Sequence, residues 1–138
     1  YENQDDTQAD MNLRGKFITD GDGCFRFRSV KPAGYPIPTS GPVGELLRAQ
    51  NRHPYRPAHL HILAFKPGFR TLITQIFVDD DAHLESDVVF GVTRALIGDF
   101  REGQGAPPQK DVSGPWHSLS HTFVMEPGPS NLPRPPIK

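Results

Sequence analysis

The chain has 138 residues, a length suited to one domain. Its 15 basic and 16 acidic side chains nearly balance, so the composition gives no sign of a basic surface for nucleic acid. Its single cysteine, Cys24, excludes an internal disulfide and a multi-cysteine zinc or iron–sulfur site within one chain. No apolar stretch approaches the roughly 20 residues that cross a bilayer, and no signal-peptide pattern opens the sequence. We therefore expect no nucleic-acid or membrane partner and a cytoplasmic location.

The first predicted elements are two short strands and a helix. The 15 prolines and 13 glycines favour short strands joined by turns over long helices. Residues 16–19 and the alternating residues 25–30 predict a hairpin around the turn at 20–23. Residues 43–51 could hold one or two helical turns.

The strongest strand signals come next. Residues 58–65 and 71–78 are apolar and β-prone, and the Pro-Gly break between them predicts a second hairpin. Residues 92–97 could be strand or helix, and residues 122–125 predict a final short strand. From Pro127 the chain is rich in proline and is expected to form an extended strap. The fold class we expect is an antiparallel β-sandwich with short helices.

His59 and His61 carry the clearest chemistry in the sequence. They are two residues apart on a predicted strand, which places both imidazoles on one face with Cα atoms about 6–7 Å apart. Two neutral imidazoles on an apolar face each need a polar partner, and one metal ion satisfies both. A bare pair of this kind is as often solvated, or satisfied within the core.

Sequence spacing leaves the metal and its other ligands open. A sulfur-rich zinc site is excluded, and the His-x-His pattern lacks the carboxylate of a ferrous facial triad. Oxygen and nitrogen donors elsewhere in the chain could each complete the site: Tyr1, Tyr35, Tyr55, Asp79, Asp80, Asp81, His53, His83 and His117.

From Tyr1 to about Gly98 the sequence resembles the catalytic domain of the intradiol ring-cleavage dioxygenases. The resemblance rests on segments that follow one another in order: NLRGKFITDGDG, GYPIPTSGPVGELL, RHPYRPAHLH, PGF with LITQIFV, and SDVVFGV. RPAHLH with GYPIP upstream is far more specific than two spaced histidines. The resemblance implies that residues 1–138 are one catalytic domain, with a helical N-terminal domain missing upstream.

The resemblance also implies a set of site residues. The family binds ferric iron, Fe(3+), through two tyrosines and two histidines, which correspond here to Tyr1, Tyr35, His59 and His61. Phenolates are hard anionic donors that suit ferric iron, whose charge lowers the pKa of its ligands. Arg56 corresponds to the arginine that stabilises negative charge on the substrate ring, and Gln75 to a glutamine near that ring. Tyr1 is expected to leave the metal when substrate binds.

The function implied is iron(III)-dependent cleavage of a catechol-type diol by molecular oxygen, between the two hydroxylated carbons, in aromatic catabolism. The product is a muconate-type diacid. Hydroxyquinol is expected over catechol, because YPIP, GPVG and RHPYRPAH resemble the hydroxyquinol branch. A homodimer is expected if the helical domain exists upstream. The alternatives are a metal-binding β-sandwich module and a zinc hydrolase that uses His59 and His61.

Overall fold

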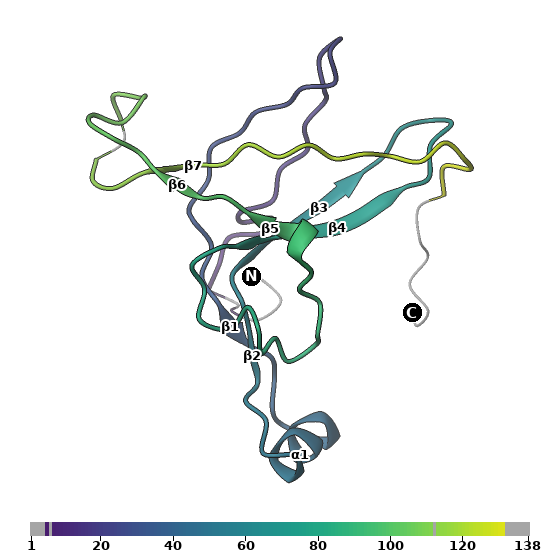
Figure 1. The fold of residues 1–138 in the computed structure, drawn as a ribbon, viewed down its shortest axis with the longest axis vertical. Helices are drawn as coiled ribbons and strands as arrows, with labels where there is room; N and C mark the ends of the chain where they lie inside the picture. The colour runs from purple at the N-terminus through teal and green to yellow at the C-terminus, as the bar shows by residue number, and fades with distance from the viewer. Residues whose placement is uncertain (1–4, 6, 112, 132–138) are drawn as a thin grey trace. The chain divides into compact units, whose positions relative to one another are not determined.

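The structure, a computed structural model, describes residue 5, residues 7–111 and residues 113–131. Contacts divide the chain into two compact units, Tyr1–Lys31 and Pro32–Lys138. Within the described ranges the chain forms seven short strands, one α-helix and one 3-10 helix (Figure 1). The predicted mainly β class with short helices is confirmed. The face-to-face packing of a sandwich stays a prediction.

Among its described residues, the first unit contains turns but no strands, and one turn lies where the hairpin was expected. The Asp20 and Gly23 amides donate to the Cys24 and Asp20 carbonyls at 2.9 and 3.1 Å. No strand forms at 16–19 or 25–30, so the predicted hairpin ladder is wrong. The alternation of apolar and polar residues instead brings Phe25 and Phe27 together against Phe17, and their rings stack on it at centroid distances of 6.3 and 5.1 Å. The segment is held by ring stacking and one turn.

In the second unit, β1 (Tyr35–Pro36) pairs antiparallel with β2 (Tyr55–Arg56), and α1 (Pro42–Ala49) lies in the connection between them (Figure 1). The predicted helical turns at 43–51 are confirmed. Proline occupies the start of α1, where its missing N–H costs no hydrogen bond. Within the described ranges, no helix has the length and apolar character needed to cross a membrane.

The central element of the second unit is the hairpin of β3 (His59–Ala64) and β4 (Leu72–Val78). Both strands and their antiparallel pairing were predicted, and all three are confirmed. Gly68 makes the turn, with a positive φ of 82° that favours glycine. A short strand, β5 (Ile97–Gly98), adds to β4 in parallel, so this edge of the sheet departs from the antiparallel pairing expected for the fold class.

The remaining elements are brief. The 3-10 helix η1 (Arg94–Leu96) precedes β5, so residues 92–97 contain both helix and strand, the two alternatives that the sequence left open. Strand β6 (Arg101–Glu102) pairs antiparallel with β7 (His117–Ser118). Residues 122–125 join no ladder, and the strand predicted there is wrong.

The start of the C-terminal segment does contact the β3–β4 turn. Arg70 and Gly128 donate backbone hydrogen bonds to Glu126 and Gly68, at 2.8 and 2.9 Å. This agrees with an extended strap as far as residue 128. Residues 132–138 of the predicted strap lie outside the described residues.

The core lies at the end of β4 and beside β2. Phe77, Val78 and Ile76 are at most 3% exposed. Two charged residues, Arg56 and Asp87, are buried almost as deeply, at 6% and 3%. A buried ion pair in such a small core costs desolvation free energy, so its placement calls for a reason beyond packing.

Candidate metal and substrate site

Strand β3 places His59 and His61 on one face, as their spacing predicts. Their ring centroids are 4.8 Å apart and the rings are nearly perpendicular, at 76°. The two Nε2 atoms approach to 3.2 Å. The strand therefore aims two nitrogen donors at the same point.

The orientation of His59 is fixed by the rigid segment that precedes it. Pro57 is fully buried, and the Ala58 amide after it donates to the Asp81 carboxylate at 2.9 Å. The Pro57 carbonyl lies 2.6 Å from Nδ1 of His59. Since a carbonyl only accepts, Nδ1 carries the proton and Nε2 presents its lone pair to the site. This is the arrangement found behind metal-bound histidines in proteins.

Both imidazoles are held in the neutral form that binds metals. Burial lowers the pKa of His59, and Arg56 and His61 lower it further, against the Pro57 hydrogen bond and Asp87, which raise it. Burial also lowers the pKa of His61, with a second contribution from Arg56, although His61 keeps an exposed edge. Neither imidazole needs to lose a proton near neutral pH before it can bind a cation.

Arg56 reaches this point from β2. Its Nη1 lies 3.2 Å from Nε2 of His59, and its Nη2 donates to Oε1 of Gln75 at 2.9 Å. Gln75 itself is opposite His61 in the β3–β4 ladder. The site thus has a buried guanidinium and an amide beside the two histidines.

Tyr35 joins the same group through the register of β1 and β2. It pairs with Arg56, and its ring centroid lies 5.6 Å from that of His59. The structure therefore brings together five of the six residues that the sequence assigned: Tyr35, Arg56, His59, His61 and Gln75. The sixth, Tyr1, lies outside the described residues.

The other candidate ligands lie elsewhere. The rings of His53, Tyr55 and His83 contact one another, with centroids 4.8 to 6.2 Å apart; Tyr55 and His83 are stacked, and His53 is tilted against both. Asp81 binds the Ala58 and His83 amides at 2.9 and 2.8 Å. His117 is on β7. Among the residues that the structure describes, no three or more His, Cys, Asp or Glu side chains are grouped for a metal.

The donors present fit a metal ion that accepts nitrogen and phenolate ligands. Two nitrogens bound to one ion at about 2.0–2.1 Å, roughly at right angles, lie about 3 Å apart, close to the Nε2 separation of His59 and His61. The third donor near them, Tyr35, supplies an anionic oxygen when deprotonated. Such a set suits a hard cation that also accepts imidazole.

Asp87 is the site residue that sequence reasoning missed. Its carboxylate accepts from Nε and Nη2 of Arg56, at 3.2 and 3.3 Å. Burial acts to raise its pKa, but Arg56 and the Gly91 and Val89 amides outweigh that effect and hold the pKa below its ordinary value. Asp87 lies within the segment SDVVFGV. Its contact with Arg56 spans 31 positions in the sequence, so no local sequence pattern predicts it.

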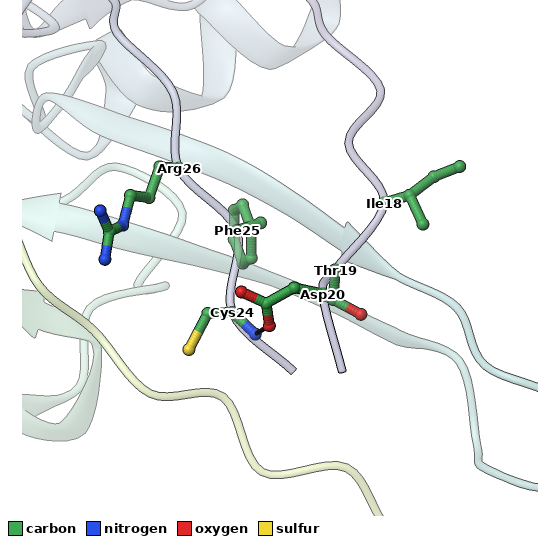
Figure 2. A pocket seen from close by; sticks show the side chains of 6 residues that line it. All are labelled: Ile18, Thr19, Asp20, Cys24, Phe25 and Arg26. Carbon is green, nitrogen blue, oxygen red and sulfur yellow. Dashed lines mark hydrogen bonds between the residues drawn. The ribbon is translucent and has the colours of Figure 1, made fainter. Parts of the chain in front are cut away.

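A separate open hollow of about 480 Å³ lies in the first unit, lined by Ile18, Thr19, Asp20, Cys24, Phe25 and Arg26 (Figure 2). The Cys24 amide donates to Asp20 Oδ1 there at 2.8 Å. Its lining includes neither histidine of the candidate site nor any other residue assigned to it.

Comparison with known proteins gives a consistent result. A family model described as "Dioxygenase" matches residues 1–126. The hydroxyquinol 1,2-dioxygenase of Rhizobium sp. strain MTP-10005 is 50% identical over 121 residues, 86% of this chain and 41% of that protein. The 6-chlorohydroxyquinol 1,2-dioxygenase of Cupriavidus pinatubonensis is 54% identical over 115 residues, 83% of this chain and 38% of its own length.

Solved structures agree with these relatives. Hydroxyquinol 1,2-dioxygenase from Pseudomonas putida DLL-E4 matches with a TM-score of 0.81 and 45% identity, over 93% of this chain and 46% of that one. Catechol 1,2-dioxygenase from Pseudomonas arvilla C-1 matches with a TM-score of 0.85 and 36% identity, over 94% of this chain and 43% of its own. The chain spans less than half the length of each of these relatives.

Proposed function

The chain belongs to the intradiol ring-cleavage dioxygenase family, and on that premise we propose that it cleaves a catechol-type diol with ferric iron and molecular oxygen. The carbon–carbon bond between the two hydroxylated carbons breaks, both oxygen atoms of O2 enter the product, and a muconate-type diacid forms. The observation that carries the proposal is the convergence of the His59 and His61 Nε2 atoms, 3.2 Å apart, beside Tyr35 and a buried Arg56.

His59, His61 and Tyr35 would hold the iron, and Tyr1 is proposed as a fourth ligand from the family resemblance. When bound, ferric iron supplies an electron-accepting centre that activates the diol toward oxygen. The chain's own contribution begins with His59, whose Nδ1–H is held by the Pro57 carbonyl so that Nε2 faces the site. Tyr1 is also proposed as the group that would accept a proton from the diol.

Arg56 is proposed to stabilise the negative charge that develops on the substrate ring. Its guanidinium is buried, which makes a fixed positive charge more effective than it would be in water. Gln75 receives one Arg56 N–H and keeps its own amide N–H groups for other partners. Arg56 is on β2, which pairs with β1, and Gln75 is on β4, which pairs with β3. These strand pairings hold both side chains in place before substrate binds.

The substrate class and the setting are part of the same proposal. The relatives named as hydroxyquinol 1,2-dioxygenases favour a small aromatic diol in a catabolic role. Residues 1–138 would be the catalytic domain, with a homodimer if a helical domain precedes it. A cytoplasmic location is compatible with the single cysteine. The alternatives are a metal-binding β-sandwich module and a zinc hydrolase on the same histidines.

One experiment separates these functions. The purified protein is loaded with ferric iron, its visible spectrum is recorded, and oxygen uptake is followed with catechol and with hydroxyquinol. We expect a burgundy tyrosinate-to-iron band and a muconate-type product identified by its ultraviolet spectrum. A colourless protein that binds zinc instead, or a coloured protein without oxygen uptake, would contradict the proposal.

Two tyrosine variants make the colour specific. Tyr35→Phe should weaken or shift the visible band, because it removes a proposed phenolate ligand. Tyr55→Phe is the matched control, since Tyr55 stacks on His83 and has no contact with the two site histidines among its ring contacts. An unchanged band in Tyr35→Phe would remove Tyr35 from the ligand set.

A further inference from the structure

We propose that Asp87 is a positioning residue that fixes the orientation of the Arg56 guanidinium at the candidate site. This inference rests on the proposed function, because it assigns Asp87 a role through the residue that faces the substrate. Asp87 lies outside the assigned ligand and substrate residues, and it acts only through its contact with Arg56.

The two hydrogen bonds between Arg56 and Asp87 hold the guanidinium in one orientation. Nε of Arg56 donates to Oδ1 of Asp87 at 3.2 Å, and Nη2 donates to Oδ2 at 3.3 Å. Two parallel bonds to one carboxylate fix the plane of a guanidinium as well as its position. Nη1 is then the nitrogen that points to His59, at 3.2 Å from Nε2.

Asp87 is itself held in place by the backbone. The Gly91 and Val89 amides donate to its carboxylate at 2.8 and 3.3 Å. The Val88 amide next to it donates to the Tyr55 carbonyl at 3.1 Å, which ties this turn to β2 directly before Arg56. The carboxylate and the guanidinium are therefore fixed to each other through the main chain as well.

Burial makes this contact matter more. The side chains of Arg56 and Asp87 are 8% and 2% exposed. An arginine cation in such surroundings needs a counter-charge, and the loss of one partner of a buried pair leaves the other uncompensated. Without Asp87 the guanidinium would turn toward water or toward other acceptors, and Nη1 would leave His59.

Gly91 completes the support. A Cβ at this position would lie 3.1 Å from Nη2 of Arg56 and 3.2 Å from Oδ2 of Asp87. These distances are shorter than an ordinary van der Waals contact. Because glycine has no Cβ, the backbone can come close enough to donate its N–H to the Asp87 carboxylate. A methyl group there would press on the pair without changing either charge.

The test compares Asp87→Asn, Arg56→Ala and the double variant in the iron-loaded protein. Asp87→Asn keeps the shape of the side chain but removes its charge and one acceptor oxygen. We expect kcat to fall by less than the roughly 100–1,000-fold that loss of a charge-stabilising donor itself costs, with iron content, colour and KM near wild type. Arg56→Ala should abolish this dependence, so the double variant should be no slower than Arg56→Ala alone.

Asp99→Asn is the matched control, because Asp99 pairs with Arg101 at an exposed place, with side chains 61% and 77% exposed. It should leave kcat unchanged. If the two site substitutions instead multiply their losses in the double variant, Asp87 does not act through Arg56 and the proposal fails. Wild-type kcat in Asp87→Asn would overturn it as well.

A crystal structure of iron-loaded Asp87→Asn gives a readout that needs no turnover. We expect Nη2 of Arg56 to have lost its hydrogen bond to Oε1 of Gln75, and a guanidinium that keeps this bond in its wild-type orientation overturns the inference whatever the activity. Failure of the proposed reaction itself would show in the wild-type protein, so the two failures are distinct. If Asp87→Asn does not fold, Gly91→Ala decides: reduced kcat with retained iron supports the proposal, and unchanged kcat overturns it.

Discussion

At the scale of single residues, two histidines are proposed to hold the metal through nitrogens that converge. Replacing His59 or His61 with Ala removes one of them, and Tyr35 cannot supply a second nitrogen. We expect either variant to lose most of its bound iron and its visible colour, measured by metal analysis and absorbance. His53→Ala is the control, because the His53 ring contacts Tyr55 and His83 instead. Full iron content in His59→Ala or His61→Ala would remove that residue from the ligand set.

Asp87 gives a prediction for stability in acid. Its pKa is below the ordinary value of 3.8 in the folded protein, so the folded state binds this proton less readily than the unfolded chain. The stabilisation is fully present above about pH 3.8 and is lost as pH falls through the folded pKa. We expect the free energy of unfolding of wild type to exceed that of Asp87→Asn by a constant amount between about pH 6 and pH 4, and the difference to shrink as pH falls below about 3.8. A difference that stays constant below that pH as well would show that the carboxylate charge does not stabilise the fold.

The candidate site could be predicted only in part from residue patterns. Period 2 on a strand was enough to bring His59 and His61 together. Tyr35 and Arg56 came from family resemblance, and the structure brings them to the histidines through the two-residue register of β1 with β2. No spacing rule reaches Asp87, because its contact with Arg56 depends on how a turn 31 positions away folds back on β2.

At the scale of elements, β4 supports the site from the core side. Phe77 is fully buried, lies opposite His59 in the ladder and has Arg56 5.9 Å above its ring. Phe77→Ala should lower the free energy of unfolding by about 3–5 kcal/mol, measured by denaturant unfolding. Ile73→Ala in the same strand is the control and should cost far less, because Ile73 is 54% exposed. Equal losses would show that burial in β4 does not decide its contribution.

The strand predictions succeeded where an apolar run had a partner nearby in the chain. Residues 58–65 and 71–78 are joined by a tight turn, so each segment supplies the hydrogen bonds that the other needs. Residues 25–30 alternate just as well, but their phenylalanines stack with Phe17 and no ladder forms. Residues 122–125 have β-prone composition but pair with no strand in the ladders of the described residues. Composition reports a preference for extended backbone, whereas a ladder needs a second strand in register.

At the scale of the whole molecule, the family match runs through both compact units, since residues 1–126 fit one model. Three of the four proposed ligands, together with Arg56, Gln75 and Asp87, belong to the second unit. Among the described residues, every residue proposed to take part in the reaction therefore lies in the second unit, Pro32–Lys138. The choice among substrates depends on a pocket wall, which His59, His61 and Arg56 alone do not define.

We expect hydroxyquinol to be the preferred substrate, catechol to follow and protocatechuate to be poor. A pocket that hydrogen-bonds the extra hydroxyl of hydroxyquinol would leave a polar group unpaired with catechol, at a cost of about 1–3 kcal/mol, or about 5–160-fold in kcat/KM. The carboxylate of protocatechuate would need a cation of its own, because the buried guanidinium of Arg56 is assigned to the negative charge of the ring. The measurement is kcat/KM on the three diols, with products identified by ultraviolet spectrum.

A preference for catechol would reverse the ranking, and a preference for protocatechuate would show that a further cation faces the substrate. Yellow semialdehyde products, which come from cleavage beside the two hydroxylated carbons, would overturn the intradiol reaction itself.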